Sequence, residues 1–366
     1  MHGDAVTRVF VGTMKGLFQF TSTDRQSWER TAFHFPDVPV YTTAFDASTQ
    51  TLYAAVNDVF FGVTVRRSTD MGRTWGAGGS APSYAGDDPE KVTRVWSLQA
   101  APGEGEGVVY AGVEASGLFR SEDGGDTWSE VASLRAHPTH ETWHPGNGGK
   151  CLHTIALDHD RAGRMYVAAS AGGAYRTDDG GKTWQPINKG VRVDFLPGGI
   201  QYPQSGQCVH KVALSPTRPG RLWMQNHGGV YRSDDGGDSW TDIGQGLVSD
   251  FGFPVVAHPH DPDKAYIVPL GGEPDNGRWC VDNQLGVYAT DDAGASWHAL
   301  NEGLPGDVYT SVLRNGMASD GHERAGLYLG TTTGSLCASN DEGATWREVA
   351  RHLSRILSVE VVDTVG

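Results

Sequence analysis

A single short motif recurs along the whole chain of 366 residues. It reads Ser/Thr-x-Asp-x-Gly-x-Thr/Ser-Trp, with copies such as SEDGGDTW, TDDGGKTW and SDDGGDSW. Seven copies align, the first of them one residue short, and their tryptophans lie 47 to 57 residues apart at Trp28, Trp75, Trp128, Trp184, Trp240, Trp297 and Trp346. A unit of this length, repeated this often, favours one repeat architecture over a string of separate domains.

The sequence around each copy predicts four short strands. A glycine opens a β-rich run 11 to 13 residues before each tryptophan, at Gly16, Gly62, Gly117, Gly173, Gly229, Gly286 and Gly334. Two further β-rich segments precede that run and one follows the tryptophan. Four strands per repeat are typical of a propeller blade. We therefore predict an all-β, seven-bladed β-propeller with four-stranded blades, formed as a single domain by residues 1–366.

The motif itself has the chemistry of a tight turn. Its Ser/Thr and Asp side chains can accept hydrogen bonds from backbone N–H groups of the same turn, and its glycine tolerates positive φ. The tryptophan gives the turn an apolar anchor. We therefore place the motif between the third and fourth strands of each blade and assign its aspartates to folding rather than to catalysis, with a calcium site as the lesser alternative.

The two ends of the chain complement each other. Residues 8–13, 16–22 and 28–33 supply only the second, third and fourth strands of the first blade. The missing innermost strand is expected at residues 354–363, which include RILSVEVVD. We predict that this C-terminal strand completes the N-terminal blade and closes the ring.

Composition argues against several classes of partner. The formal net charge is −15 and no run of Lys or Arg is present, which disfavours nucleic acid and anionic membrane surfaces. No apolar run approaches the roughly 18 residues of a membrane span, and no leader with a basic and then an apolar stretch is visible. Four cysteines in a chain of this length do not suggest a disulfide framework. These features predict a cytoplasmic protein with free thiols.

Long irregular connections point to a pocket. They span residues 135–150, 191–207 and 271–284, and all three fall on the face opposite the turn motifs if the blades are wound in the usual way. Loops of this length in a compact domain are usually functional. We therefore predict a binding pocket at the mouth of the central channel on that face.

Histidines gather on one sector of the same face. Aligning the innermost strands places one residue from each at an equivalent position: Tyr41, Trp96, His153, His210, Phe253, Tyr309 and Leu357. His153 and His210 each follow a cysteine by two residues, and His227 lies in an adjacent turn. Three interpretations stay open. The histidines pack within an aromatic ring, or they act as a general acid or base, or His153, His210 and His227 bind one divalent metal such as Zn, Mn, Fe or Ca.

Other residues of this face complete the candidate site. His144 and Glu141 are possible additional metal ligands, whereas joint ligation by Cys151 and His153 looks awkward because the two are separated along the strand. The catalytic candidates are His153, His210, Glu141 and Glu114. The candidates for ligand binding are Trp96, His144, Trp143, Tyr202, Asn226, Arg278, Trp279 and Tyr309.

The repeated motif resembles the Asp-box, also called the BNR repeat. Sialidases, xyloglucan hydrolases and photosystem II assembly factors carry it as part of their scaffold, so the resemblance implies the propeller fold rather than one activity. The sialidases have six blades and an N-terminal FRIP-type arginine motif, whereas RVFVGT stands at that place here. We therefore transfer no sialidase residue to this chain.

Three functions follow for testing. The first is an enzyme of hydrolase or lyase type, or a binding protein, that takes a small polar molecule or sugar derivative in the histidine-rich pocket. The second is an assembly scaffold with a protein partner, against which we note no arginine patch in the sequence. The third is a glycoside hydrolase, whose two carboxylates would come from Glu114, Glu141, Asp194, Asp250, Glu273, Asp275 and Asp282.

Overall fold

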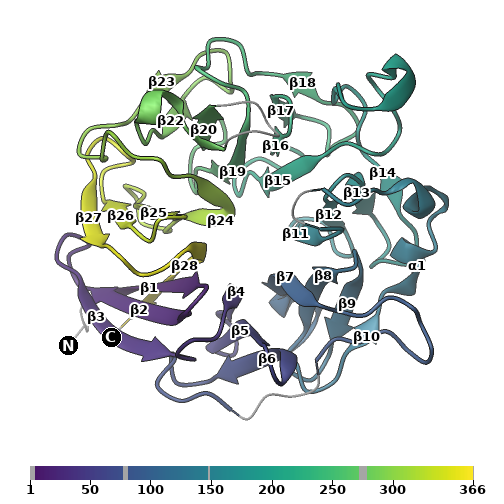
Figure 1. Ribbon diagram of the computed structural model, residues 1–366, viewed down its shortest axis with the longest axis horizontal. Helices are drawn as coiled ribbons and strands as arrows, with labels where there is room; N and C mark the ends of the chain where they lie inside the picture. Colours follow the sequence, from purple (N-terminus) through teal and green to yellow (C-terminus); the bar gives the residue numbers. More distant parts are fainter. Residues whose placement is uncertain (1–4, 77–80, 147–148, 272–277, 366) are drawn as a thin grey trace.

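Antiparallel sheets built from consecutive strands stand in a ring around one axis (Figure 1). The computed structural model describes residues 5–76, 81–146, 149–271 and 278–365. In the described chain the strands β4, β7, β11, β15, β19, β24 and β28 lie nearest the axis, and the other strands of each sheet lie further out (Figure 1). The prediction of an all-β propeller fold is confirmed in this coarse form.

Three consecutive sheets have four strands each. The first holds β7 (Arg94–Ala100), β8 (Val109–Glu114), β9 (Leu118–Ser121) and β10 (Ser129–Glu130). The second holds β11 (Leu152–Leu157), β12 (Met165–Ala169), β13 (Gly173–Thr177) and β14 (Gln185–Pro186). The third holds β15 (Val209–Leu214), β16 (Leu222–Asn226), β17 (Val230–Ser233) and β18 (Thr241–Asp242). In each sheet the strands follow one another as the repeat predicts.

Two further sheets depart from four strands. One holds β4 (Val40–Asp46), β5 (Thr51–Asp58) and β6 (Gly62–Ser68), so it has three strands within the described residues. The other holds β19 (Gly252–Ala257), β20 (Ala265–Gly271), β22 (Tyr288–Thr290) and β23 (His298–Ala299), with β21 (Trp279–Cys280) paired to the end of β20. The extra strand arises because the connection between β20 and β22 is long enough to fold back on β20.

The two ends of the chain meet in one sheet. It runs β27 (Arg347–Ala350), β26 (Leu336–Ser339), β25 (Leu327–Thr331), β24 (Val312–Ser319), β28 (Ile356–Val365), β1 (Ala5–Thr13), β2 (Gly16–Ser22) and β3 (Glu29–His34). Strand β28 pairs antiparallel with β1, with Val361 opposite Val9, and joins β24 through one parallel pair, Asn315 and Ser358. The C-terminal strand thus pairs with the N-terminal one, although it begins and ends two residues later than predicted.

Helical segments are short and lie in the connections. They are α1 (Ala132–Arg135) and the 3-10 turns η1 (Pro102–Glu104), η2 (Pro138–Thr142), η3 (Pro197–Gly199) and η4 (Val281–Asn283). Within the described residues, no helix has the length and apolar character needed to cross a membrane. All four cysteines are free thiols, as predicted.

The repeated motif forms the turn that its chemistry predicts. In the copy at residues 177–184, the Asp179 carboxylate accepts the backbone N–H of Thr183 at 2.9 Å and its hydroxyl at 2.7 Å. The Thr177 hydroxyl donates to the same carboxylate at 2.8 Å and accepts the N–H of Gly181 at 2.9 Å. These bonds satisfy the backbone of the turn without using any residue near the axis.

The tryptophans join neighbouring sheets. The indole N–H of Trp240 donates to the carbonyl of Ile187 at 2.7 Å, and that of Trp297 donates to the carbonyl of Ile243 at 2.7 Å. In both cases the acceptor follows the preceding sheet. The core lies between sheets as well, since one buried cluster combines Tyr110 of β8 with Val167 of β12. The motif therefore sets the spacing of the ring as well as the turns.

Candidate functional site

A cavity of about 900 Å³ occupies the centre of the ring. The innermost strands or the residues just before them supply much of its wall, including Tyr41, Trp96, His153, His210 and Phe253. Connections supply the rest, among them His144 and Phe195. None of the turn-motif aspartates lines it. Six of the seven aligned inner residues, all except Tyr309, thus line one space of the size that small-molecule sites usually have.

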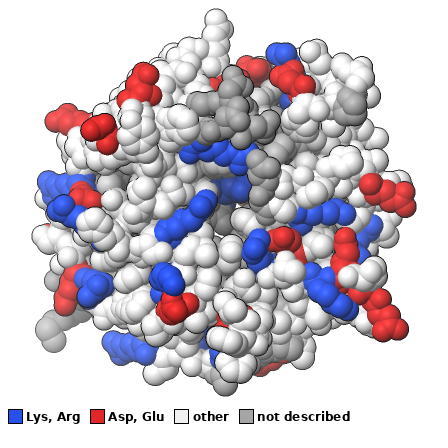
Figure 2. Space-filling model, in the orientation of Figure 1, with Lys and Arg blue, Asp and Glu red and all other residues white. Residues whose placement is uncertain are grey.

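The cavity is basic although the protein is acidic. Arg94, Arg278, Arg314 and Arg355 line it together with four histidines, and none of its described lining residues is Asp or Glu. Figure 2 shows Lys and Arg side chains around the central hollow of this face. With a formal net charge of −15 for the chain, this local excess of positive charge marks the cavity as a place for an anion.

Two of the arginines are held by different means. Arg94 forms a 2.9 Å ion pair with Glu114, and the same Glu114 oxygen accepts the indole N–H of Trp96 at 3.1 Å. Arg314 instead lies over the ring of Phe253, with its Cζ atom 5.2 Å from the ring centroid. Its Nε atom is buried and has no hydrogen-bond partner in the described chain.

The two inner-strand histidines are buried and uncharged. Burial first, and then the nearby Arg314 cation, hold the pKa values of His153 and His210 well below the ordinary value. The Nδ1 atom of His153 lies 3.0 Å from the hydroxyl of Thr154, and its Nε2 has no hydrogen-bond partner in the described chain. A neutral imidazole with a vacant nitrogen can accept a proton or a metal.

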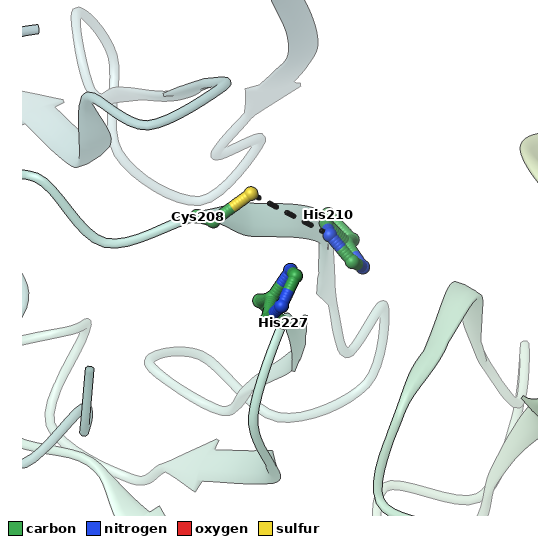
Figure 3. A group of neighbouring side chains, drawn as sticks. All are labelled: Cys208, His210 and His227. Atoms are coloured by element: carbon green, nitrogen blue, oxygen red, sulfur yellow. Dashed lines mark hydrogen bonds between the residues drawn. The ribbon is translucent and has the colours of Figure 1, made fainter. Parts of the chain in front are cut away.

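Cys208, His210 and His227 form a tight cluster in the cavity wall (Figure 3). The Sγ atom of Cys208 lies 3.6 Å from Nε2 of His210, and one ligand atom from each of the three residues lies within 4.8 Å of the others. The pairing of β15 with β16 shifts between Val209 and Lys211, where the chain bulges. Because a bulge changes the direction of successive side chains, a cysteine and a histidine two residues apart can turn toward each other here.

A lysine and a glutamate on the innermost strands are both buried and interact electrostatically. The ammonium group of Lys211 on β15 contacts the side-chain oxygen of Asn315 on β24. Burial lowers the pKa of Lys211 to about 8 and raises the pKa of Glu360 on β28 to about 7. The opposite charge of each partner works against these shifts, so the pair lies in an environment that disfavours both charged forms.

Comparison with known proteins identifies the repeat. A family model described as BNR/Asp-box repeat matches residues 175–186, which include the Asp179 turn. The chain carries the BNR/Asp-box repeat. That family model covers one copy, and the other copies repeat its hydrogen bonds, as at Asp235 and Asp292.

Relatives that share sequence or fold include glycoside hydrolases. A xyloglucanase, Xgh74A, from Acetivibrio thermocellus is 25% identical over 236 residues, or 56% of this chain and 26% of that protein. A GH74 enzyme from Niastella koreensis has a TM-score of 0.60 at 16% identity, over 93% of this chain and 51% of that one. YCF48 from Cyanidioschyzon merolae has a TM-score of 0.53 at 14% identity, over 89% and 92%. The sequence matches thus span about a quarter of the curated xyloglucanases, and the two structures show the fold alone.

Six of the residues expected from sequence line the cavity inside the ring of BNR/Asp-box repeats. They are Trp96, His144, His153, His210, His227 and Arg278. His153 does not belong to the tight cluster, in which Cys208 occurs instead. Glu114 stands just behind the wall, where it holds Arg94 and Trp96.

The other expected residues lie away from the cavity. Trp143 is buried behind it, with its indole N–H donating to the hydroxyl of Tyr175 at 2.8 Å, and Asn226 is buried and donates to the carbonyl of Arg192 at 3.2 Å. Glu141 is exposed in a separate groove. Three further candidates are exposed and do not line the cavity: Tyr202, Trp279 and Tyr309.

Tyr309 departs from its expected place because of the strand that follows it. Strand β24 begins only at Val312, and its pairing with β25 shifts between Val312 and Met317. The cavity is therefore lined by Leu313 and Arg314 rather than by Tyr309. Of the carboxylates proposed for glycoside hydrolysis, Glu273 and Asp275 lie outside the described residues.

The basic lining was missed from sequence, although a signal was available. Residues two positions before the aligned inner residues share their side of an alternating strand. The residues at that position are Pro39, Arg94, Cys151, Cys208, Phe251, Asp307 and Arg355, of which five are ionisable. Reading that second position would have found Arg94, Cys208 and Arg355 but not Arg314, which depends on the irregular start of β24. The arginine patch absent from the linear sequence is thus assembled by the ring.

Proposed function

We propose that the protein binds a small anionic molecule in the central cavity, such as a sugar derivative that carries a carboxylate or a phosphate, and processes it by hydrolysis or elimination. The observation that carries the proposal is the set of four arginines, Arg94, Arg278, Arg314 and Arg355, that line a cavity whose described lining has no carboxylate. A bound anion would offset this local positive charge and accept hydrogen bonds from the guanidinium groups of the wall.

Arginine side chains are well suited to binding an anion of defined shape. A guanidinium can donate two parallel hydrogen bonds to a carboxylate or phosphate, and each charge-assisted bond is stronger than a neutral one. Phe253 supports Arg314 from one side, so its plane is set before a ligand arrives. Tyr41 and Trp96 form an apolar part of the same wall, with ring centroids 5.6 Å apart, and suit the carbon face of a sugar.

The reaction is assigned to a neutral imidazole. His153 lines the cavity and is uncharged at neutral pH, so it is our candidate for the group that accepts a proton in hydrolysis or elimination. His144, at the exposed rim, is the second histidine candidate for proton transfer.

Ligand-dependent stabilisation tests the proposal. Thermal unfolding is followed with inorganic phosphate, glucose 6-phosphate, glucuronate and neutral glucose, since a ligand that binds only the folded state raises Tm. We expect at least one anion to raise Tm, glucose to have no effect, and Arg314→Gln to abolish the shift. Arg30→Gln, which changes an exposed arginine of β3, is the matched control. Equal shifts in wild type and Arg314→Gln would contradict the proposal.

Turnover is tested separately from binding. The anion with the largest shift is incubated with the protein and the mixture is analysed by NMR for hydrolysis or elimination products. We expect His153→Asn to lower turnover while the thermal shift stays. Binding without any turnover would assign the cavity to a binding protein.

Glycoside hydrolysis is the second candidate, favoured by the 25% identity to a xyloglucanase. This chemistry requires two carboxyl groups, about 5 to 9.5 Å apart, on either side of the scissile bond. The described lining of the cavity provides none, and Glu114 is engaged by Arg94 and Trp96. Release of reducing ends from xyloglucan would support this candidate, and its loss in Glu114→Gln would place the reaction here.

We further infer that the ring has seven blades. The repeat occurs seven times, and the sheet of eight strands divides into β24–β27 and β28 with β1–β3 at the single parallel pair between β24 and β28. On this interpretation the C-terminal strand closes the ring as the innermost strand of the first blade.

A further inference from the structure

We propose that Cys208, His210 and His227 bind one zinc ion, with the fourth coordination position open to the central cavity. This set differs from the three histidines expected from sequence, because a thiolate replaces His153. The zinc proposal rests on these three side chains and does not depend on the anion-binding function. Either proposal can therefore be wrong while the other holds.

The observed spacing fits a tetrahedral ion. With Zn–S of about 2.3 Å and Zn–N of about 2.0–2.1 Å, tetrahedral angles put a sulfur and a nitrogen ligand about 3.6 Å apart. The measured separation between Sγ of Cys208 and Nε2 of His210 is 3.6 Å. His227 follows β16, its ring lies beside the other two side chains in Figure 3, and its ligand atom is within 4.8 Å of both.

Contacts on the side of the ring away from Cys208 set the orientation of His210. Its Nδ1 lies 2.5 Å from the carbonyl oxygen of Gly252, which accepts a hydrogen bond, so Nδ1 carries the proton and the Nε2 lone pair faces Cys208. A backbone carbonyl on the far nitrogen is the usual outer support of a histidine that ligates a metal. Phe253 packs against the same ring, with centroids 4.7 Å apart.

The neighbouring sheet provides an internal comparison. Cys151 and His153 repeat the spacing of Cys208 and His210. Ser170 occupies the place of His227, since its N–H donates to the carbonyl of Cys151 at 2.9 Å just as that of His227 donates to the carbonyl of Cys208 at 2.9 Å. The Ser170 hydroxyl lies 3.2 Å from the Cys151 thiol. One sheet therefore has three ligands that converge, and its neighbour has the same cysteine and histidine with no third imidazole.

The donor set selects the kind of metal. One sulfur and two imidazole nitrogens suit zinc, whereas calcium and magnesium require oxygen ligands, which this cluster lacks. On binding, the Cys208 thiol gives its proton to solvent as the S–Zn bond forms, and the two imidazoles bind as neutral ligands. Thiolate and Zn²⁺ together carry one positive charge. Arg278 and Arg314 line the same cavity, so an anionic ligand, or water in its absence, is the expected fourth ligand.

Cobalt substitution tests the site. The chelator-treated full-length protein is titrated with Co²⁺, whose bond to a thiolate produces a charge-transfer absorption band, and Zn²⁺ is then added as a competitor. We expect one equivalent of Co²⁺ to produce the band, one proton to be released per metal, and Zn²⁺ to remove the band. Absence of the band in wild type would overturn the proposal.

Variants assign the ligands. Cys208→Ser should abolish the charge-transfer band, and His227→Ser, which copies the neighbouring sheet, should weaken binding at least about tenfold if a metal ligand is lost. Cys151→Ser is the matched control and should bind like wild type. Tm and circular dichroism confirm that each variant is folded. A band that persists in Cys208→Ser, or that is lost equally in Cys151→Ser, would overturn the assignment.

Discussion

The guanidinium group of Arg314 lies against the ring of Phe253, with 5.2 Å between Cζ and the ring centroid. Arg278 approaches the same ring at 5.8 Å, so one aromatic side chain supports two cations of the cavity. The face of an aromatic ring attracts a cation and leaves the N–H groups at the edge of the guanidinium available for another acceptor.

This contact predicts that Phe253→Leu weakens anion binding while all charges remain. A cation–π contact contributes roughly 0.5–2 kcal/mol, so we expect affinity for the best-binding anion to fall by about twofold to thirtyfold. Isothermal calorimetry measures the change. Phe33→Leu, at an exposed ring of β3 away from the cavity, is the control. Unchanged affinity in Phe253→Leu would show that the aromatic support is not needed.

The Asp-box turns predict a specific loss of stability in acid. Hydrogen bonds from the backbone N–H of Thr183, then from its hydroxyl and that of Thr177, lower the pKa of Asp179 to about 2. Because this folded-state pKa is below the unfolded value of about 4, the ionised carboxylate stabilises the fold above pH 4. That stabilisation is lost as pH falls from 4 to 2.

Asp179→Asn should therefore flatten the pH dependence of unfolding in that window. Urea unfolding at several pH values measures the free energy of unfolding. The control is Asp87→Asn, which changes an exposed aspartate that belongs to none of the Asp-box motifs. A variant whose stability falls between pH 4 and 2 as steeply as that of wild type would argue against this account of the turn.

The bond between neighbouring sheets predicts that Trp240→Phe is destabilising. The substitution removes the indole N–H and leaves the Ile187 carbonyl without its 2.7 Å partner. Leaving a buried polar group unpaired costs about 1–3 kcal/mol, and we expect the free energy of unfolding to fall by at least that amount. Trp279→Phe changes a more exposed tryptophan and should have a much smaller effect. Similar losses in the two variants would contradict the role assigned to the bond.

Ring closure predicts a large effect of truncation. Removing residues 354–366 deletes β28, which pairs with β1 along its length and reaches β24 on its other side. We expect a Tm at least several degrees lower than that of the full chain, or loss of cooperative unfolding. A truncated chain with the Tm of the full chain would show that the C-terminal strand does not close the ring.

Local chemistry explains what the sequence could predict. The turn at Asp179 is formed by side chains and backbone groups within eight residues, so the motif alone determines it and, by repetition, the sheets around it. Trp96, His153 and His210 line the cavity, and each stands where the pairing of its inner strand shifts by one residue. Because this irregularity recurs at the same place in successive repeats, aligning the repeats was enough to place them.

Irregular backbone explains what could not be predicted. The contact between Cys208 and His210 is not determined by their spacing, since Cys151 and His153 have the same spacing and a shift at the same place. The position of Arg314 depends on where β24 starts and bulges. Trp143 lies in a long connection whose path is set by its contact with Tyr175, which no local pattern reveals. Only the folded ring brings the arginines of distant repeats to one cavity.

The central claim, an anion site built around Arg314, is tested most directly by calorimetry on wild type and Arg314→Gln with inorganic phosphate, glucose 6-phosphate, glucuronate and glucose. A hydrogen bond to a charged group contributes about 1.5–3 kcal/mol, so the account predicts that at least one anion binds wild type and binds the variant about tenfold more weakly or worse, while glucose binds neither. Failure of all three anions to bind wild type, or equal affinity in the two proteins, would contradict it.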